Sequence, residues 1–401
     1  MKSSRSKYVR FIALFAVLAL ALSACGSDSD SGDGGSSNSG NAETKEGGDI
    51  VIAAEQELTN FNQNTSADNL LWGAMVVRLI WPQMYFQTPD LKLEPGFMAD
   101  GRAEVLKKDP FTLQWKINKD ANWADGTPVS SDDLEYYWES CNGKIDPGEP
   151  VTPPEEAGDE ETTGVDCVST DGYDQVTKFT KVDEKTVQAE FKGPIAEYES
   201  LFSNPMPPAH IAKEFGKDGW AKAFVSSPGT SAGPYQLKSY KKGDSITLEK
   251  NPKFWGTPAN LDTITFRFIP KPADMITALG NGEVDLIYPQ PQTDLVQQVA
   301  DLPGVEDVTS IGVQWEHLTY NLRNKALADP KVRQAVNLGV NRQEIVDKLL
   351  KTFTEDATVL NNRIYMNNQP EYKDNSGNFA NRVLSSSAIA SWNFASTSGL
   401  A

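Results

Sequence analysis

A serine in a glycine-rich pentapeptide, GTSAG at residues 229–233, is the first candidate for chemistry in this chain. The pattern surrounds the nucleophile of many hydrolases, where a strand precedes the serine and a helix follows it. Here Pro228 precedes the pentapeptide, a strand-like run begins at Pro234, and only His210 and His317 could serve as the base. The context favours a glycine-rich turn, so we predict that the protein is not an enzyme. Without an HExxH, CxxC or phosphate-binding glycine motif, we also expect no metal site and no cofactor.

A second set of candidates is an aromatic ring, a carboxylate and an imidazole in a row, Trp315-Glu316-His317. Strand alternation would place Trp315 and His317 on one face. Ligand clefts favour aromatic rings with a few placed polar groups, so these two side chains are candidates for ligand binding. A core tryptophan beside an exposed histidine fits the sequence equally well.

Alternating apolar residues predict the strands that would position such sites. Phe111, Leu113, Trp115 and Ile117 alternate with polar residues, which is typical of a half-buried strand. The same alternation predicts strands at 187–191, 246–248 and 264–268.

Helix-start signals complete a mixed α/β pattern. Ser130 and Asp133 have the spacing of a capping box, and the residues after them predict an apolar helix face of Leu134, Tyr137 and Trp138. We expect a further helix over 272–279 that stops at Gly280, and then a buried strand at 284–287.

Two more helices are expected to begin at Asp329-Pro330 and at Asn341. Their predicted apolar faces are Val332, Ala335, Val336 and Val340 in the first helix, and Ile345, Val346 and Leu349 in the second.

Composition limits the classes of partner. The chain has 401 residues and a formal charge of −18, which argues against binding to nucleic acid. Its hydrophobic content of 39% is enough for large cores, and about 350 ordered residues suggest two or three domains.

The N-terminus has the pattern of an export signal. Basic residues precede an apolar run at 11–22, which is too short to span a bilayer. The sequence LSAC at 22–25 resembles the lipobox of bacterial lipoproteins, which implies cleavage after residue 24 and a lipid on Cys25. An ordinary secretory signal with a chance cysteine is the alternative. Residues 25–47 are rich in Gly, Ser and Asp, and we expect them to form a disordered tether.

Two further cysteines, Cys141 and Cys167, bracket an acidic stretch rich in Pro and Gly. If Cys25 carries lipid, they remain as a pair in an oxidising compartment, where disulfides persist. A bridge of this length would stabilise the fold by about 3.5 kcal/mol in the chain-entropy model. Two free thiols are the alternative.

A series of short runs, in order, resembles the family 5 solute-binding proteins, the extracytoplasmic receptors of peptide- and nickel-type ABC importers. The runs are GDIVIA at 48–53, LTNFN at 58–62, LQWKI at 113–117, WADGTPVSSDD at 123–133, GPYQL at 233–237, LEKNPKFWG at 248–256, GEVD at 282–285, Asn321, DPKVRQA at 329–335 and NRQEIV at 341–346.

The resemblance implies an α/β type II periplasmic-binding-protein fold, with two lobes that close on a ligand. Residues 48–82 and 200–318 would form the first lobe, with an inserted subdomain at 83–199, and 319–401 would begin the second lobe. Glu57, Leu58 and Thr59 align with the segment that runs beside bound peptide in oligopeptide-binding relatives, and Asn321 marks the crossing into the second lobe.

The same resemblance implies the setting. We expect a monomer held by lipid on the outer face of the cell membrane, with a permease and an ATPase as partners and an oligopeptide as ligand. Similar actinobacterial lipoproteins bind glycolipid mannosides without serving an importer, and Trp315-Glu316-His317 resembles that branch.

The C-terminal part departs from the family pattern. Residues 383–401 contain no charged side chain, whereas 23% of the whole chain is charged. We therefore expect that the reading frame is lost near Ala380, which leaves the second lobe incomplete. Resequencing of the locus would test this, because an intact stop codon with no family-like sequence in another frame downstream would refute it.

Overall fold

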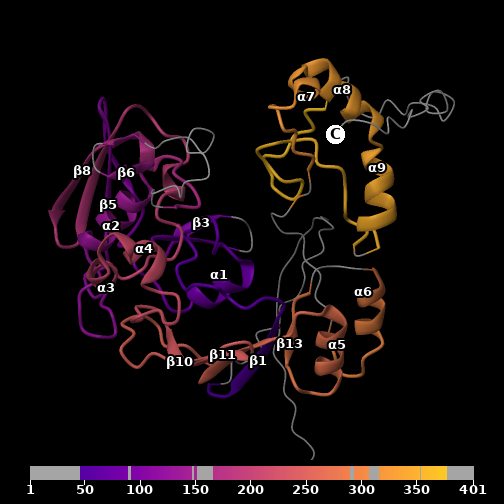
Figure 1. Ribbon diagram of the computed structural model, residues 1–401, viewed down its shortest axis with the longest axis horizontal. Coiled ribbons are helices and arrows are strands. Elements are labelled where there is room, and N and C mark those ends of the chain that lie inside the picture. Colours follow the sequence, from indigo (N-terminus) through magenta and orange to yellow (C-terminus); the bar gives the residue numbers. More distant parts are fainter. Residues whose placement is uncertain are drawn as a thin grey trace, which may run out of the picture. The chain divides into compact units, whose positions relative to one another are not determined.

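The protein is a mixed α/β protein whose two larger sheets are built from separate parts of the chain (Figure 1). The computed structural model describes residues 46–88, 92–146, 149–150, 166–289, 293–306, 315, 317–352 and 354–376. The predictions for the signal, Cys25, the tether before residue 46, Glu316 and the tail 380–401 lie outside these residues. Within the described ranges, no helix is long and apolar enough to cross a membrane.

The larger sheet has five strands in the order β10-β11-β12-β1-β13. β1 (Asp49–Ala54) lies parallel to β12 (Thr263–Phe268) on one side and to β13 (Leu286–Ile287) on the other. β10 (Tyr235–Lys241) and β11 (Ser245–Lys250) form an antiparallel hairpin beside β12. The strands predicted at 246–248 and 264–268 are therefore confirmed.

The two faces of this sheet are covered differently, because successive strand residues point to opposite sides. Ala54 joins the main core, whereas Ala53 packs with Met275 and Ala278 of α5 (Pro272–Gly280). The helix predicted at 272–279 is confirmed. The buried strand predicted at 284–287 is only partly right: Val284 is buried, but the strand holds just two residues and Leu286 is 42% exposed. An edge strand has a neighbour on one side only, so its side chains are covered less.

The second sheet has four antiparallel strands in the order β4-β5-β9-β8. Its central strands, β5 (Phe111–Lys116) and β9 (Thr186–Phe191), bury the alternating residues that the sequence predicted. The edge strands are β4 (Glu104–Lys108) and β8 (Val176–Asp183). One continuous cluster of buried residues includes Trp115 of this sheet and Phe266 of the five-stranded sheet, so the two sheets share a core.

Short elements fill the connections. They are α1 (Leu71–Val77), β2 (Tyr85–Gln87), β3 (Leu93–Pro95), β6 (Lys144–Asp146), β7 (Glu149–Pro150), α3 (Ala209–Glu214), α4 (Gly219–Lys222), α6 (Thr293–Ala300) and the 3₁₀ turns Tyr173–Gln175, Tyr198–Ser200 and Gly216–Asp218.

The predicted capping box begins α2 (Ser131–Cys141) and extends beyond its own helix. The Ser130 side chain accepts from the N–H of Asp132, and the Ser130 N–H donates to Asp133 Oδ2 at 2.8 Å. The other oxygen, Asp133 Oδ1, accepts from the N–H of Ala209 at 2.9 Å. Asp133 thus joins the start of α2 to the start of α3.

We expect Asp133→Asn to lower the free energy of unfolding by about 2 kcal/mol. An amide offers one acceptor oxygen, so one of the two backbone N–H groups would face an NH₂ group instead. Urea unfolding measures this loss. Asp132→Asn is the matched control, because the exposed Asp132 only pairs with Lys181, and its loss should cost less than about 1 kcal/mol. Equal losses in the two variants would contradict the role of Asp133.

Residues 317–376 contain α7 (Lys325–Ala328), α8 (Pro330–Gly339), α9 (Arg342–Ile345) and a π-helical turn, Val346–Leu350. The predicted helix starts are confirmed, since Asp329 Oδ1 accepts from the N–H of Lys331 and Asn341 Oδ1 from that of Glu344.

The apolar faces of these helices are largely exposed in the described residues. Val346 is buried, but Val332 and Val336 are 36% and 38% exposed, and Ile345 and Leu349 are 43% and 58% exposed. A cap needs only neighbouring residues, whereas a buried face needs a second surface to pack against it. Sequence periodicity shows which face is apolar but not what covers it.

A disulfide joins Cys141, the last residue of α2, to Cys167. Cys141 is fully buried. The bond closes the acidic stretch between the two cysteines at its base.

Candidate functional site

The first candidate segment, residues 55–59, directly follows β1. The carboxylate of Glu57 accepts two hydrogen bonds, from the hydroxyl of Tyr240 at 2.6 Å and from the N–H of Gly243 at 2.9 Å. Both donors belong to the hairpin of β10 and β11. Burial and the neighbouring Glu57 carboxylate raise the pKa of Tyr240, so its hydroxyl stays protonated and able to donate. These two bonds hold the segment against the five-stranded sheet.

The next two residues differ in exposure. Leu58 as a whole is 3% exposed and belongs to the main core, and its carbonyl accepts from the Tyr240 hydroxyl at 3.3 Å, so the structure leaves neither its side chain nor its backbone open to a ligand. Thr59 is exposed, and its hydroxyl donates to Asp68 Oδ1 at 2.6 Å. Among the three predicted residues of this segment, Thr59 therefore has the most accessible side chain.

Thr59 leads into a loop of buried polar side chains, residues 60–68, which we call the asparagine loop. Its buried polar residues are Asn60, Asn62, Gln63, Asn64 and Thr65. Asp68 closes it, because Oδ2 accepts from the Thr65 hydroxyl at 2.8 Å and from the Asn60 amide at 3.1 Å. Buried polar groups of this kind need hydrogen bonds, and the loop supplies them within itself and to its neighbours.

The second candidate pair, Trp315 and His317, lies together but not on a strand. Their ring centroids are 4.3 Å apart, and Trp315 is 45% exposed. Residues 317–320 have no regular secondary structure, so the alternation that predicted a strand there is wrong. Asn321 is exposed and its side chain accepts from the N–H of Arg323, which closes a local turn.

The serine of the pentapeptide has a structural role. Ser231 is 2% exposed, and its hydroxyl lies within hydrogen-bond distance of two backbone carbonyls, Ile80 O at 2.9 Å and Tyr235 O at 2.6 Å. It also accepts from the N–H of Gly233. β10 follows the pentapeptide, so the predicted glycine-rich turn is confirmed. His210 instead pairs with Asp125, Nε2 to Oδ2 at 2.8 Å.

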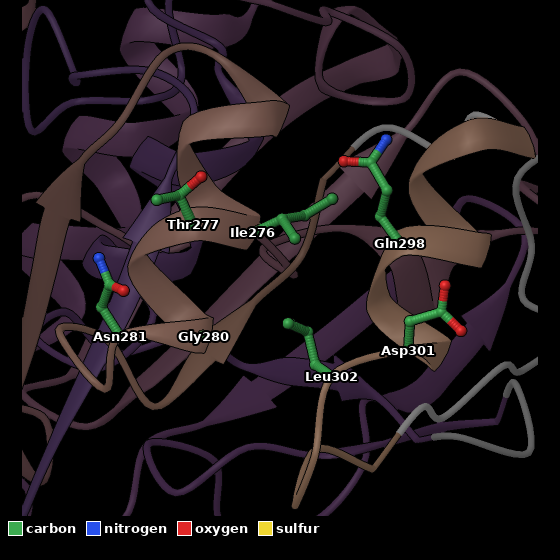
Figure 2. A pocket seen from close by; sticks show the side chains of 7 residues that line it. All are labelled: Ile276, Thr277, Gly280, Asn281, Gln298, Asp301 and Leu302. Carbon is green, nitrogen blue, oxygen red and sulfur yellow. The ribbon is translucent and has the colours of Figure 1, made fainter.

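An open groove of about 450 Å³ lies between α5 and α6 (Figure 2). Ile276 of α5 and Gln298 of α6 point into the space between the helices, and Leu302 lies at its lower end. None of the predicted ligand residues lines this groove. Within the described ranges, no group of three or more His, Cys, Asp or Glu side chains could hold a metal ion.

Sequence reasoning missed two parts of the first site, Tyr240 and the asparagine loop. The loop had a signal, since four side-chain amides within 60–64 are unusual outside a turn and such side chains compete for backbone groups. Tyr240 had none, because 183 residues separate it from Glu57.

Most of this chain is similar to a known family of proteins. Residues 98–386 match the family model described as "Bacterial extracellular solute-binding proteins, family 5 Middle". The match covers more than two thirds of the chain.

Two curated relatives come from Mycobacterium tuberculosis. The oligopeptide-binding protein OppA is 24% identical over 339 residues, which are 84% of this chain and 54% of the relative. The probable monoacyl phosphatidylinositol tetramannoside-binding protein LpqW is 24% identical over 297 residues, which are 72% of this chain and 43% of the relative. The chain thus spans about half the length of the curated relatives it matches.

A solved structure, the periplasmic EDTA-binding protein EppA, matches with a TM-score of 0.72 and 27% sequence identity. The match covers 83% of this chain and 61% of EppA. This likeness confirms the predicted fold class, the α/β type II periplasmic-binding-protein fold.

Proposed function

The chain belongs to the bacterial extracellular solute-binding proteins of family 5, and from this premise we propose that it captures a solute outside the cytoplasmic membrane for an ABC importer. The family match over residues 98–386 is the observation that carries the proposal. The default ligand is an oligopeptide, because a relative aligned over 84% of this chain, OppA, is an oligopeptide-binding protein. The protein holds its ligand without chemical change.

Capture would use two lobes that close on the ligand. We assign the first lobe to 48–82 and 200–318, the inserted subdomain to 83–199 and the start of the second lobe to residue 319. In support, every strand of the five-stranded sheet comes from the two first-lobe ranges, and every strand of the four-stranded sheet comes from the inserted range.

The ligand would contact Glu57, Leu58 and Thr59 on the first lobe, together with Trp315, His317 and Asn321. Thr59 is exposed and follows the segment that Glu57 holds, whereas Leu58 is buried and is a candidate from the family resemblance alone. Extended peptides are commonly bound through backbone hydrogen bonds, which give affinity without demanding one sequence.

The second candidate ligand is a glycolipid or sugar, with binding that does not serve import. LpqW, whose name describes binding of a mannosylated phosphatidylinositol, is 24% identical. The exposed Trp315 ring next to His317 supports this alternative, because aromatic faces with a polar neighbour suit ligands that carry both apolar and polar surfaces.

The setting follows from the sequence pattern at the N-terminus. A lipid on Cys25 and a flexible tether would keep a monomeric receptor at the outer face of the membrane, near its permease and ATPase partners. Two or more acyl chains are needed for firm attachment.

A thermal-shift screen of the whole mature chain tests the ligand class. A ligand at 100 times its Kd stabilises a protein by about 2.7 kcal/mol, which raises the melting temperature by several degrees. We expect oligopeptides to raise it, whereas mannosylated glycolipids, free sugars, metal ions and metal–EDTA complexes should not. A rise with glycolipid alone would support the alternative, and a rise with none of the compounds would contradict both.

A further inference from the structure

The residues on either side of Cys167 in the sequence form hydrogen bonds to the asparagine loop. The carboxylate of Asp166 accepts from the N–H of Ser66 at 2.9 Å, and the N–H of Val168 donates to the carbonyl of Asn64 at 2.7 Å. The residues immediately before and after Cys167 therefore both hold the loop that follows Thr59.

Trp220 of α4 joins the same two segments by a second route. Its indole N–H donates to the carbonyl of Asp166 at 2.9 Å, and its own carbonyl accepts from the side-chain amide of Asn62 at 2.7 Å. The indole also packs edge-on against Tyr137, with ring centroids 5.5 Å apart.

Helix α2 supplies a third contact as well as the disulfide. The Tyr137 hydroxyl donates to Asn64 Oδ1 at 3.0 Å, and Cys141, one turn further along the same helix, bonds to Cys167. Because α2 packs into the main core, the disulfide fixes residues 166–168 to a buried helix rather than to a surface loop.

The loop in turn positions the candidate ligand segment. Asp68, at the end of the loop, binds the hydroxyls of both Thr59 and Thr65. If the contacts at Asn64 and Ser66 were lost, the loop would move and Thr59 would move with it. A ligand would then have to order Thr59 again on binding.

We propose that the Cys141–Cys167 disulfide and Asp166 are positioning elements for ligand binding, acting through the asparagine loop on Thr59. This inference rests on the proposed function for its effect on affinity. Preorganised contacts bind more tightly because less conformational entropy is lost on binding. Without the bond, the segment 166–168 loses its covalent link to α2, and we expect the loop to open while the two sheets stay folded.

Amide hydrogen exchange of the whole chain tests the structural step without a ligand. In the double variant Cys141→Ser/Cys167→Ser, we expect the N–H groups of Ser66 and Val168 to exchange at least about tenfold faster than in the wild type, and well before Leu113 in β5, which exchanges only when the whole fold opens. Unchanged exchange at Ser66 and Val168 would overturn the inference. Exchange of Ser66 and Val168 at the same rate as Leu113 in the double variant would overturn it too, because the loop would then open only together with the whole fold.

A series of Asp166 variants keeps the disulfide and tests the inference if the double cysteine variant does not fold. Asp166→Ala removes the acceptor for Ser66, so Ser66 should exchange faster, whereas Asp166→Asn keeps an acceptor oxygen and should restore protection. Asp171→Ala, an exposed carboxylate on the same segment, is the control and should have no effect. Identical exchange in the alanine and asparagine variants of Asp166 would overturn the role of its carboxylate.

Binding of tri-alanine and of a synthetic nonapeptide, measured by calorimetry, tests the effect on affinity. We expect the double variant and Asp166→Ala to bind about tenfold more weakly than the wild type. Equal affinity would overturn the inference. If the wild type itself bound neither peptide, the proposed peptide function would fail, and the exchange experiment would still decide the inference.

Discussion

Replacing Gly233 by alanine is expected to lower the free energy of unfolding by about 3 kcal/mol or more. A Cβ at this position would lie 2.4 Å from the carbonyl oxygen of Leu79 and 2.9 Å from that of Ile80. Both are backbone atoms, so neither can rotate away as a side chain would.

Close contact with the backbone of Leu79 and Ile80 explains why the last residue of the pentapeptide is glycine. The N–H of Gly233 donates to Ile80 O at 2.8 Å, which brings the turn directly against the chain that follows α1. Ser231 bonds to the same carbonyl. The pentapeptide is therefore a site of close backbone contact, and its glycine provides space instead of supporting a nucleophile.

Urea unfolding of Gly233→Ala and of Gly193→Ala measures this effect. A methyl group on Gly193 would meet no atom within 4 Å, so this substitution should change stability by less than about 0.5 kcal/mol. Equal midpoints in the two variants would show that the turn adapts to a side chain, and would contradict the packing described for it.

Replacing Cys25 by alanine is expected to move the protein from the membrane fraction to the soluble fraction almost completely. Each buried methylene of an acyl chain contributes about 0.8 kcal/mol to membrane partitioning, so losing two or more chains removes nearly all of the attachment. Fractionation of cells, together with labelling by a radioactive fatty acid, measures the change.

Ser27→Ala in the tether is the matched control and should remain membrane-bound and labelled. Wild-type protein that carried no fatty acid and was recovered in the soluble fraction would favour the ordinary secretory signal. That result would exclude a lipid on Cys25 but would not contradict the family assignment.

Local features of the fold were predictable from neighbouring residues. The strand at 111–116 followed from its alternation, and the capping box at Ser130 and Asp133 from its spacing. The starts of α8 and α9 followed from Asp329 and Asn341 in the same way. Each of these signals depends on contacts within a few residues, which is why sequence reasoning could find them.

Long-range arrangement was not predictable from the same signals. Alternation and capping within 49–54 do not indicate that β1 lies between β12 and β13, more than 200 residues away, and only the family resemblance placed 48–82 and 200–318 in one lobe. The contact of Asp133 with Ala209 and the exposure of Val332 and Leu349 likewise depend on which surfaces meet.

The candidate site was predictable only in part. The resemblance identified Glu57, Leu58 and Thr59, but it could not show that the Glu57 carboxylate binds Tyr240 or that Leu58 is buried. Both facts follow from the way β1 and the β10–β11 hairpin pack together. They leave Thr59 as the residue of this segment whose side chain is best placed for a ligand.

Titration calorimetry of the mature protein with oligopeptides tests the central claim, that this chain is a solute-binding receptor, most directly. The account predicts saturable one-to-one binding with a Kd in the micromolar range or tighter, and a negative heat-capacity change from the burial of apolar surface. The absence of saturable heat with peptides, mannosylated glycolipids and metal–EDTA complexes alike would contradict it.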